Sequence, residues 1–205
     1  ELQKSYKVKK MPLYPFVYKG FRNRHYWVGV KKKIVIYRYE NMKVNLVSVD
    51  DDIKELIKQI NLSSWDEQDD IEHYSIKALL AYLEKQDTVF LACYTEVQGI
   101  ETLTGIASGR LEQKPYDFSK WLYIDEVDTC SNHRKKGVAT AMMQTFLKLA
   151  KEKHCEEVWL CTERENLAAR KLYESLNPND EGDIIGYTFK GWLQNLFKLI
   201  LKRKF

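Results

Sequence analysis

The sequence of 205 residues predicts one domain of the α+β (mixed α/β) class. Segments with strand periodicity and segments with helix periodicity are interspersed along the chain, and neighbouring strand segments are close enough to pair as hairpins. A hydrophobic fraction of 44% with a net charge of only +4 is typical of a folded chain and excludes a disordered one. A transmembrane helix is not predicted, because no run of about 18 apolar residues occurs.

The strands are predicted from short apolar or alternating runs, and the helices from apolar residues three and four positions apart. The predicted strands are 42–49, 88–95, 103–111, 121–130, 157–162 and 184–189. The predicted helices are 53–60, 71–83, 137–154 and 167–176. The first helix follows Asp50, Asp51 and Asp52, which supply an N-cap and acidic residues at the positive end of the helix dipole. We expect the acidic stretch 65–70 to be a loop.

Charge is segregated along the chain. Residues 1–41 contain 11 Lys or Arg and 2 acidic residues, residues 42–189 contain 17 and 27, and residues 190–205 contain 5 and none. The sequence therefore predicts a basic N-terminal extension, an acidic domain over 42–189 and a basic amphipathic tail. An acidic domain favours a cationic substrate through long-range attraction.

The segment after the predicted strand 121–130 carries the most chemical information. A basic turn, Arg134-Lys135-Lys136, leads through Gly137 into a helix that opens with Val138, Ala139 and Thr140. The N–H groups at a helix N-terminus lack intrahelical partners and bind phosphates well. A basic turn before a helix is also ordinary solvated surface, and the turn alone leaves both interpretations open.

Two motifs resemble those of the GCN5-related N-acetyltransferases, a superfamily that uses acetyl-coenzyme A. Arg134-x-x-Gly137-x-Ala139 resembles its Q/R-x-x-G-x-G/A motif, and Asn166-x-x-Ala169-x-x-x-Tyr173 resembles its second signature. The resemblance covers about 148 of 205 residues and departs from the pattern at Asn177-Pro178, where the family has Gly-Phe. Within the family, the chain is most similar to the small-type aminoglycoside 3-N-acetyltransferases, which confer antibiotic resistance.

The resemblance implies a sheet that is mostly antiparallel and splayed at the acetyl-coenzyme A site. It also implies that Tyr173 protonates the departing thiolate, although a core aromatic is the alternative. The coenzyme-binding residues that it implies are Val127 and Thr129 through their backbones, Arg134, Lys135, Lys136, Gly137, Val138, Ala139, Thr140 and Asn166. Asn166 has a second explanation, as the N-cap of its helix. No metal ligand spacing occurs, so no metal is expected.

Three carboxylates crowd one predicted strand. In a regular strand, Glu126 and Asp128 share a face and Asp125 takes the other. Alignment with the aminoglycoside enzymes makes Glu126 the expected catalytic base, with Asp125 and Asp128 as substrate-binding groups or as solvated acids. The acidic run Asp66, Glu67, Asp69 and Asp70 is the other candidate wall for a polycationic acceptor, with a solvated loop as the alternative.

The expected activity is transfer of an acetyl group to an amine of a small cationic acceptor, favouring an aminoglycoside. The alternatives are a protein or peptide N-acetyltransferase and a non-catalytic coenzyme A-binding module. Unpaired cysteines favour a reducing cytoplasm. No nucleic acid partner is expected, because residues 1–41 contain no reader motif. A homodimer is kept as an alternative state, and the tail is assigned to packing on its own domain, on a partner chain or on a membrane surface.

Overall fold

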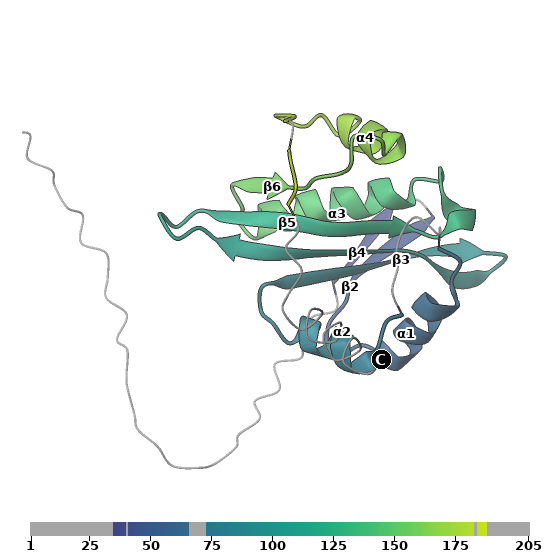
Figure 1. The fold of residues 1–205 in the computed structure, drawn as a ribbon. Helices are drawn as coiled ribbons and strands as arrows, with labels where there is room; N and C mark the ends of the chain where they lie inside the picture. The colour runs from purple at the N-terminus through teal and green to yellow at the C-terminus, as the bar shows by residue number, and fades with distance from the viewer. Residues whose placement is uncertain (1–34, 40, 66–72, 183, 188–205) are drawn as a thin grey trace, which may run out of the picture. The chain divides into compact units, whose positions relative to one another are not determined.

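A six-stranded sheet is the central element of the structure (Figure 1). The computed structural model describes residues 35–39, 41–65, 73–182 and 184–187, which all belong to a unit of residues 32–205. The strands are β1 Val35–Tyr39, β2 Met42–Leu46, β3 Thr88–Val97, β4 Ile100–Gln113, β5 Lys120–Thr129 and β6 Glu157–Trp159. The helices are α1 Ile53–Leu62, α2 Ile76–Leu83, α3 Val138–Glu152 and α4 Leu167–Glu174, with a 3-10 turn at Ser131–His133.

The strands lie in the order β1-β2-β3-β4-β5-β6, and of the pairs among the described residues only β5 and β6 are parallel. That parallel pairing covers only Trp121–Tyr123 of β5. In the described residues, β5 therefore continues from Ile124 to Thr129 without a neighbouring strand on its outer side. The expected mixed, mostly antiparallel sheet with a splay next to this strand is confirmed.

Helices cover both faces of the sheet, and each face has its own core. Figure 1 shows α1 and α2 on one face and α3 on the other, with α4 on the side of α3. Met142 and Phe146 of α3 pack on alternate residues of the strands, such as Leu91 and Leu122. The opposite core is formed by α1, α2 and the intervening strand residues, which include Phe90 and Ile106. This alternation follows from the two-residue period of a strand.

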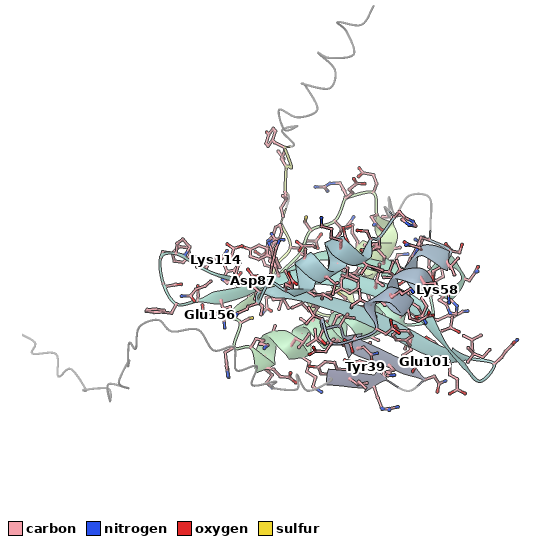
Figure 2. The ribbon with its side chains drawn as sticks, turned by 90° about the horizontal axis from the view of Figure 1, so that it is seen from below. Tyr39, Lys58, Asp87, Glu101, Lys114 and Glu156 are labelled. Carbon is pink, nitrogen blue, oxygen red and sulfur yellow. The ribbon has the colours of Figure 1, made fainter. Side chains whose placement is uncertain are left out.

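The central hairpin is longer than the sequence pattern indicates. The strands predicted at 88–95 and 103–111 leave residues 96–101 as a loop, but β3 and β4 continue to a two-residue turn at Gln98 and Gly99. Both turn residues have positive φ, as the tight turn of a twisted hairpin requires. Figure 2 shows Glu101 and Lys114 at opposite ends of this long antiparallel region.

The first strand of the sheet lies ahead of Met42. Residues 35–39 were expected in the basic extension, but they pair with β2 from Val35↔Leu46 to Tyr39↔Met42. The side chain of Tyr37 is buried and its hydroxyl donates to Glu152 Oε2 of α3 at 2.9 Å. The segment predicted to begin the sheet is thus its second strand.

The helix boundaries follow local capping residues. The predicted N-cap of α1 is confirmed, because Asp52 Oδ1 accepts from Glu55 N at 3.0 Å. The second helix was expected from residue 71, but its N-cap is Ser75, whose hydroxyl accepts from Ala78 N at 3.2 Å. The strand predicted at 184–189 is not formed over 184–187, and its last two residues lie outside the described residues.

Candidate active site

A β-bulge in β5 places the three carboxylates of this strand. Gly109 of β4 pairs with Ile124, and Ser108, which precedes Gly109, pairs with Glu126. Asp125 is therefore the extra residue of β5. Ile124 and Val127 both pack on the α3 core. The two residues between them therefore project to the opposite face, as the paired positions of a bulge do.

The bulge overturns one expectation about the strand. Asp125 was expected on the face opposite Glu126, but both project toward the side of α2, and Asp128 lies on that face as well. The pKa of Tyr82 of α2 agrees with this placement of both acids. Burial, then the charge of Asp125 and, to a smaller extent, that of Glu126 raise it to about 12. The sequence pattern assumed unbroken alternation, which the extra residue interrupts.

Asp125 and Glu126 have different partners. Asp125 forms an ion pair with the guanidinium of Arg110, which lies over the ring of Tyr123. Glu126 Oε2 accepts a long hydrogen bond of 3.4 Å from the hydroxyl of Ser108. The charge of Asp125 is therefore largely balanced by a neighbouring side chain, whereas Glu126 accepts from a neutral hydroxyl.

Two tyrosines from the α2 region, Tyr74 and Tyr82, lie near these acids, and the sequence pattern indicates a functional role for neither. Burial, followed by the charges of Glu126 and Asp128, raises the pKa of Tyr74. The hydroxyl of Tyr82 donates to the carbonyl of Gly109 at 2.7 Å, which ties α2 to the bulge. Tyr74 belongs to the apolar pattern that predicted a helix over 71–83, and no local signal indicates which charged residues lie across the sheet.

Tyr173 of α4 lies near one of these acids, Asp128. Its side chain is half-buried and packs against the α3 core. Burial and then the charge of Asp128 raise its pKa above the ordinary value of about 10. The phenol is accordingly protonated at neutral pH. Asp128 is thus the carboxylate whose charge acts on both Tyr74 and Tyr173.

The predicted phosphate-binding turn leads directly into α3. Gly137 occupies the N-cap of α3 with φ of 84°, and no side chain caps the helix. Arg134, Lys135 and Lys136 are exposed beside it. Uncapped N–H groups, a positive dipole end and three cations make this an anion-binding arrangement.

The start of α3 lies close against the sheet because β4 has a glycine there. A Cβ at Gly105 would lie 2.7 Å from Val138 Cγ1 and 2.9 Å from the carbonyl oxygen of Asp128. Gly105 pairs with Thr129, whose buried hydroxyl has no partner among the described residues. The unpaired edge of β5, this orphan hydroxyl and the anion-binding turn together fit the extended, phosphate-bearing shape of a coenzyme A.

The remaining predicted residues have separate outcomes. Asn166 is the N-cap of α4, its Oδ1 accepting from Ala169 N at 3.0 Å, so the structural explanation is confirmed and a coenzyme contact stays a prediction. The acidic run Asp66, Glu67, Asp69 and Asp70 and the tail 190–205 lie outside the described residues. Over the described ranges, no group of three acidic, His or Cys side chains could hold a metal, and no helix is long and apolar enough to cross a membrane.

Comparisons with known proteins agree with this geometry. A model of the acetyltransferase (GNAT) family matches residues 51–177. N-acetyltransferase family 8 member 3 of Rattus norvegicus is 28% identical over 111 residues, which are 54% of this chain and 48% of that protein. The chain therefore spans about half the length of that relative.

Two solved structures of aminoglycoside acetyltransferases share the fold. The enzyme meta-AAC0020 from an uncultured soil metagenomic sample, in complex with trehalose, superimposes with a TM-score of 0.62 at 16% identity over 73% of this chain and 96% of its own. AAC(6')-Iy, in complex with the bisubstrate analogue CoA-S-monomethyl-acetylneamine, superimposes with a TM-score of 0.56 at 16% identity over 73% of this chain and 99% of its own. At such identities the likeness is one of fold.

Proposed function

Because the chain belongs to the acetyltransferase (GNAT) family, we propose that it is an acetyl-coenzyme A-dependent N-acetyltransferase. The observation that carries the proposal is the uncovered outer edge of β5, with the carboxylates of Glu126 and Asp128 on one face of the strand and Tyr173 packed against the core on the other. A carboxylate and a protonated phenol on either side of that edge can take a proton from an amine and return one to a thiolate.

The coenzyme is proposed to lie along β5 with its pyrophosphate on the turn before α3. Gly137 lets the backbone approach the phosphates, and Lys135 and Lys136 supply positive charge with Arg134. The backbone groups of Val127 and Thr129 pair with the pantetheine arm as a neighbouring strand would. Acetyl-coenzyme A supplies the activated acetyl group as a thioester.

Glu126 is proposed as the base. It removes a proton from the acceptor's ammonium group, directly or through a water molecule, so that the neutral amine can attack the thioester carbonyl. The C–N bond forms as the C–S bond breaks, and Tyr173 gives its proton to the departing sulfur. The new amide nitrogen then loses its second proton through solvent, which restores the phenol of Tyr173. Asp128 holds the cationic acceptor in place, whereas Asp125 is engaged by Arg110.

The acceptor is proposed to be a small cationic amine, with an aminoglycoside favoured. The carboxylates of β5, of which Asp128 is partly buried and the other two are exposed, and the acidic composition of residues 42–189 support a cationic acceptor. The two structural neighbours are described as aminoglycoside acetyltransferases. Acetylation at the 3-amino group is proposed from the sequence resemblance.

The test is release of coenzyme A thiol from acetyl-coenzyme A across a panel of aminoglycosides, polyamines and basic peptides. We expect turnover with aminoglycosides, and NMR of the product identifies the acetylated nitrogen. Glu126→Gln is expected to lower kcat far more than Asp125→Asn, its neighbour in the bulge, while both variants bind coenzyme A normally. Turnover of peptides alone would show that the acceptor is a protein or peptide. Coenzyme binding without any turnover would show that the protein is a non-catalytic binding module.

A further inference from the structure

One side-chain amide at the end of α1 holds both backbone groups of a residue ahead of α2. Asn61 Nδ2 donates to the carbonyl oxygen of Tyr74 at 3.0 Å, and Tyr74 N donates to Asn61 Oδ1 at 3.1 Å. Two hydrogen bonds from one planar group fix the position and the orientation of the Tyr74 backbone. The same end of α1 is tied to the β5–α3 connection, because Ser131 N donates to the carbonyl oxygen of Ser64 at 2.8 Å.

The Tyr74 ring packs on a cross-strand row of paired residues, Phe90, Ser108 and Glu126. The ring meets Phe90 edge-on, with centroids 6.0 Å apart. Phe90 pairs across the sheet with Ser108, and Ser108 pairs with Glu126 and donates to its carboxylate on this face. Burial and the charges of Glu126 and Asp128 raise the pKa of Tyr74, which agrees with this placement.

From this geometry we propose that Tyr74 orients the acceptor's ammonium group through its phenol oxygen and that Asn61 is a positioning residue that acts through Tyr74. The inference rests on the proposed function, because it deepens the description of the same acceptor site. The phenol moves no proton. It accepts a hydrogen bond from the ammonium group beside Glu126 and Asp128, which satisfies one of the ammonium donors as it leaves water.

The Asn61–Tyr74 clamp, in which the Asn61 amide positions Tyr74 for the acceptor, and a purely structural role of Asn61 predict different kinetics. If Asn61 only stabilises the end of α1, its loss lowers the stability of the protein and leaves the acceptor KM unchanged. If Asn61 acts through Tyr74, its loss raises the acceptor KM only as long as the Tyr74 hydroxyl is present. A double-mutant cycle separates these cases, because residues that act through one another are non-additive.

The experiment uses the full chain and the amine that the panel identifies as the best acceptor. Tyr74→Phe and Asn61→Ala are each expected to raise the acceptor KM about tenfold, the size of one lost hydrogen bond to a charged group. The double variant is expected to match Tyr74→Phe alone, and the KM for acetyl-coenzyme A is expected to stay within about twofold throughout. If Asn61→Ala does not fold, Asn61→Asp replaces it, since it keeps the acceptor for Tyr74 N but loses the donor to the Tyr74 carbonyl.

Tyr94→Phe is the matched control. Tyr94 is another partly buried phenol on the same sheet face, but it lies on β3 beside Lys43. Its substitution is expected to leave the acceptor KM unchanged. Additive effects of Asn61 and Tyr74, an equal rise in both KM values or an unchanged acceptor KM would overturn the clamp while the acetyltransferase stands. A wild-type protein that acetylates no amine would overturn both.

Discussion

The protonation state of Tyr173 decides what this side chain can do in the proposed reaction. Burial and the neighbouring charge of Asp128 raise its pKa above about 10. The phenol therefore holds its proton through the neutral range, as a proton donor to a thiolate must, and cannot act there as a base.

Replacing Tyr173 tests this role. Tyr173→Phe is expected to lower kcat by about 10²- to 10³-fold, because a positioned general acid contributes on that order. Coenzyme A affinity, measured by calorimetry, is expected to stay unchanged. Tyr116→Phe is the control, because Tyr116 is 72% exposed on the β4–β5 connection. Full activity in Tyr173→Phe would remove this residue from the mechanism.

Gly137 offers a second prediction at the scale of one residue. Gly137→Ala forces an alanine to φ of 84° and is expected to destabilise the protein by about 1–2 kcal/mol. Gly99→Ala imposes the same kind of strain at φ of 78° in the β3–β4 turn, where a new Cβ meets open space. Urea unfolding should show a similar loss for both, whereas coenzyme A affinity should fall only for Gly137→Ala. Equal affinities would contradict a phosphate site at this turn.

Among the elements, β5 has the largest consequence for the site. Its bulge turns Asp125 and Glu126 to one face, and the absence of a partner beyond Tyr123 in the described residues leaves its backbone edge available. Gly109 makes the bulge sterically feasible, because a Cβ there would lie 2.6 Å from the carbonyl oxygen of Tyr123. The Tyr123 backbone could move away from such a Cβ only if the pairing register of β4 and β5 changed.

Gly109→Ala is therefore expected to disturb β5 itself. We expect a loss of about 1–3 kcal/mol of unfolding free energy from overpacking, together with a fall in kcat/KM that is larger than this loss of folded protein explains. The control is Gly182→Ala, where no atom lies within 4 Å of the new Cβ. The measurements are urea unfolding and initial rates at a temperature where both variants are fully folded. A stable Gly109→Ala protein with normal rates would show that the bulge tolerates a side chain.

At the scale of the whole molecule, buried phenols link stability to alkaline pH. Burial is the main cause that raises the pKa of Tyr82 and of Tyr94 to about 12, and it also raises the pKa values of Tyr37 and Tyr74. A phenol that keeps its proton more firmly in the folded state adds stability that is complete below its unfolded value of about 10. That stability is lost as the pH rises toward the folded value.

The urea midpoint is accordingly expected to be nearly constant between about pH 8 and pH 9.5 and to fall steadily above about pH 10. A variant with Tyr82→Phe and Tyr94→Phe removes two of the linked protons, and its midpoint should fall less steeply over the same interval. A wild-type midpoint that is level up to about pH 11.5 would show that these phenols titrate equally in the folded and unfolded chains.

Much of the architecture was readable from the sequence because it depends on local patterns. Apolar spacing predicted α1, α3 and α4, the acidic N-cap at Asp52 was confirmed, and the α+β class with its splayed sheet was right. The motif around Gly137 predicted a turn into a helix N-terminus, which the positive φ of this glycine confirms. Each of these features is set by residues within a few positions of one another.

Contacts across the sheet were decided by the tertiary structure alone. The bulge at Asp125 depends on the pairing of β5 with Gly109 and Ser108, and a strand read by itself alternates without interruption. Strand β1 could not be predicted from its basic stretch, because its contact with the domain is made by Tyr37, which reaches α3. The meeting of Tyr74 with the acids of β5 joins residues about 50 positions apart. Sequence patterns specify local conformation and the face that is buried, whereas register and long-range neighbours are fixed only when the elements pack.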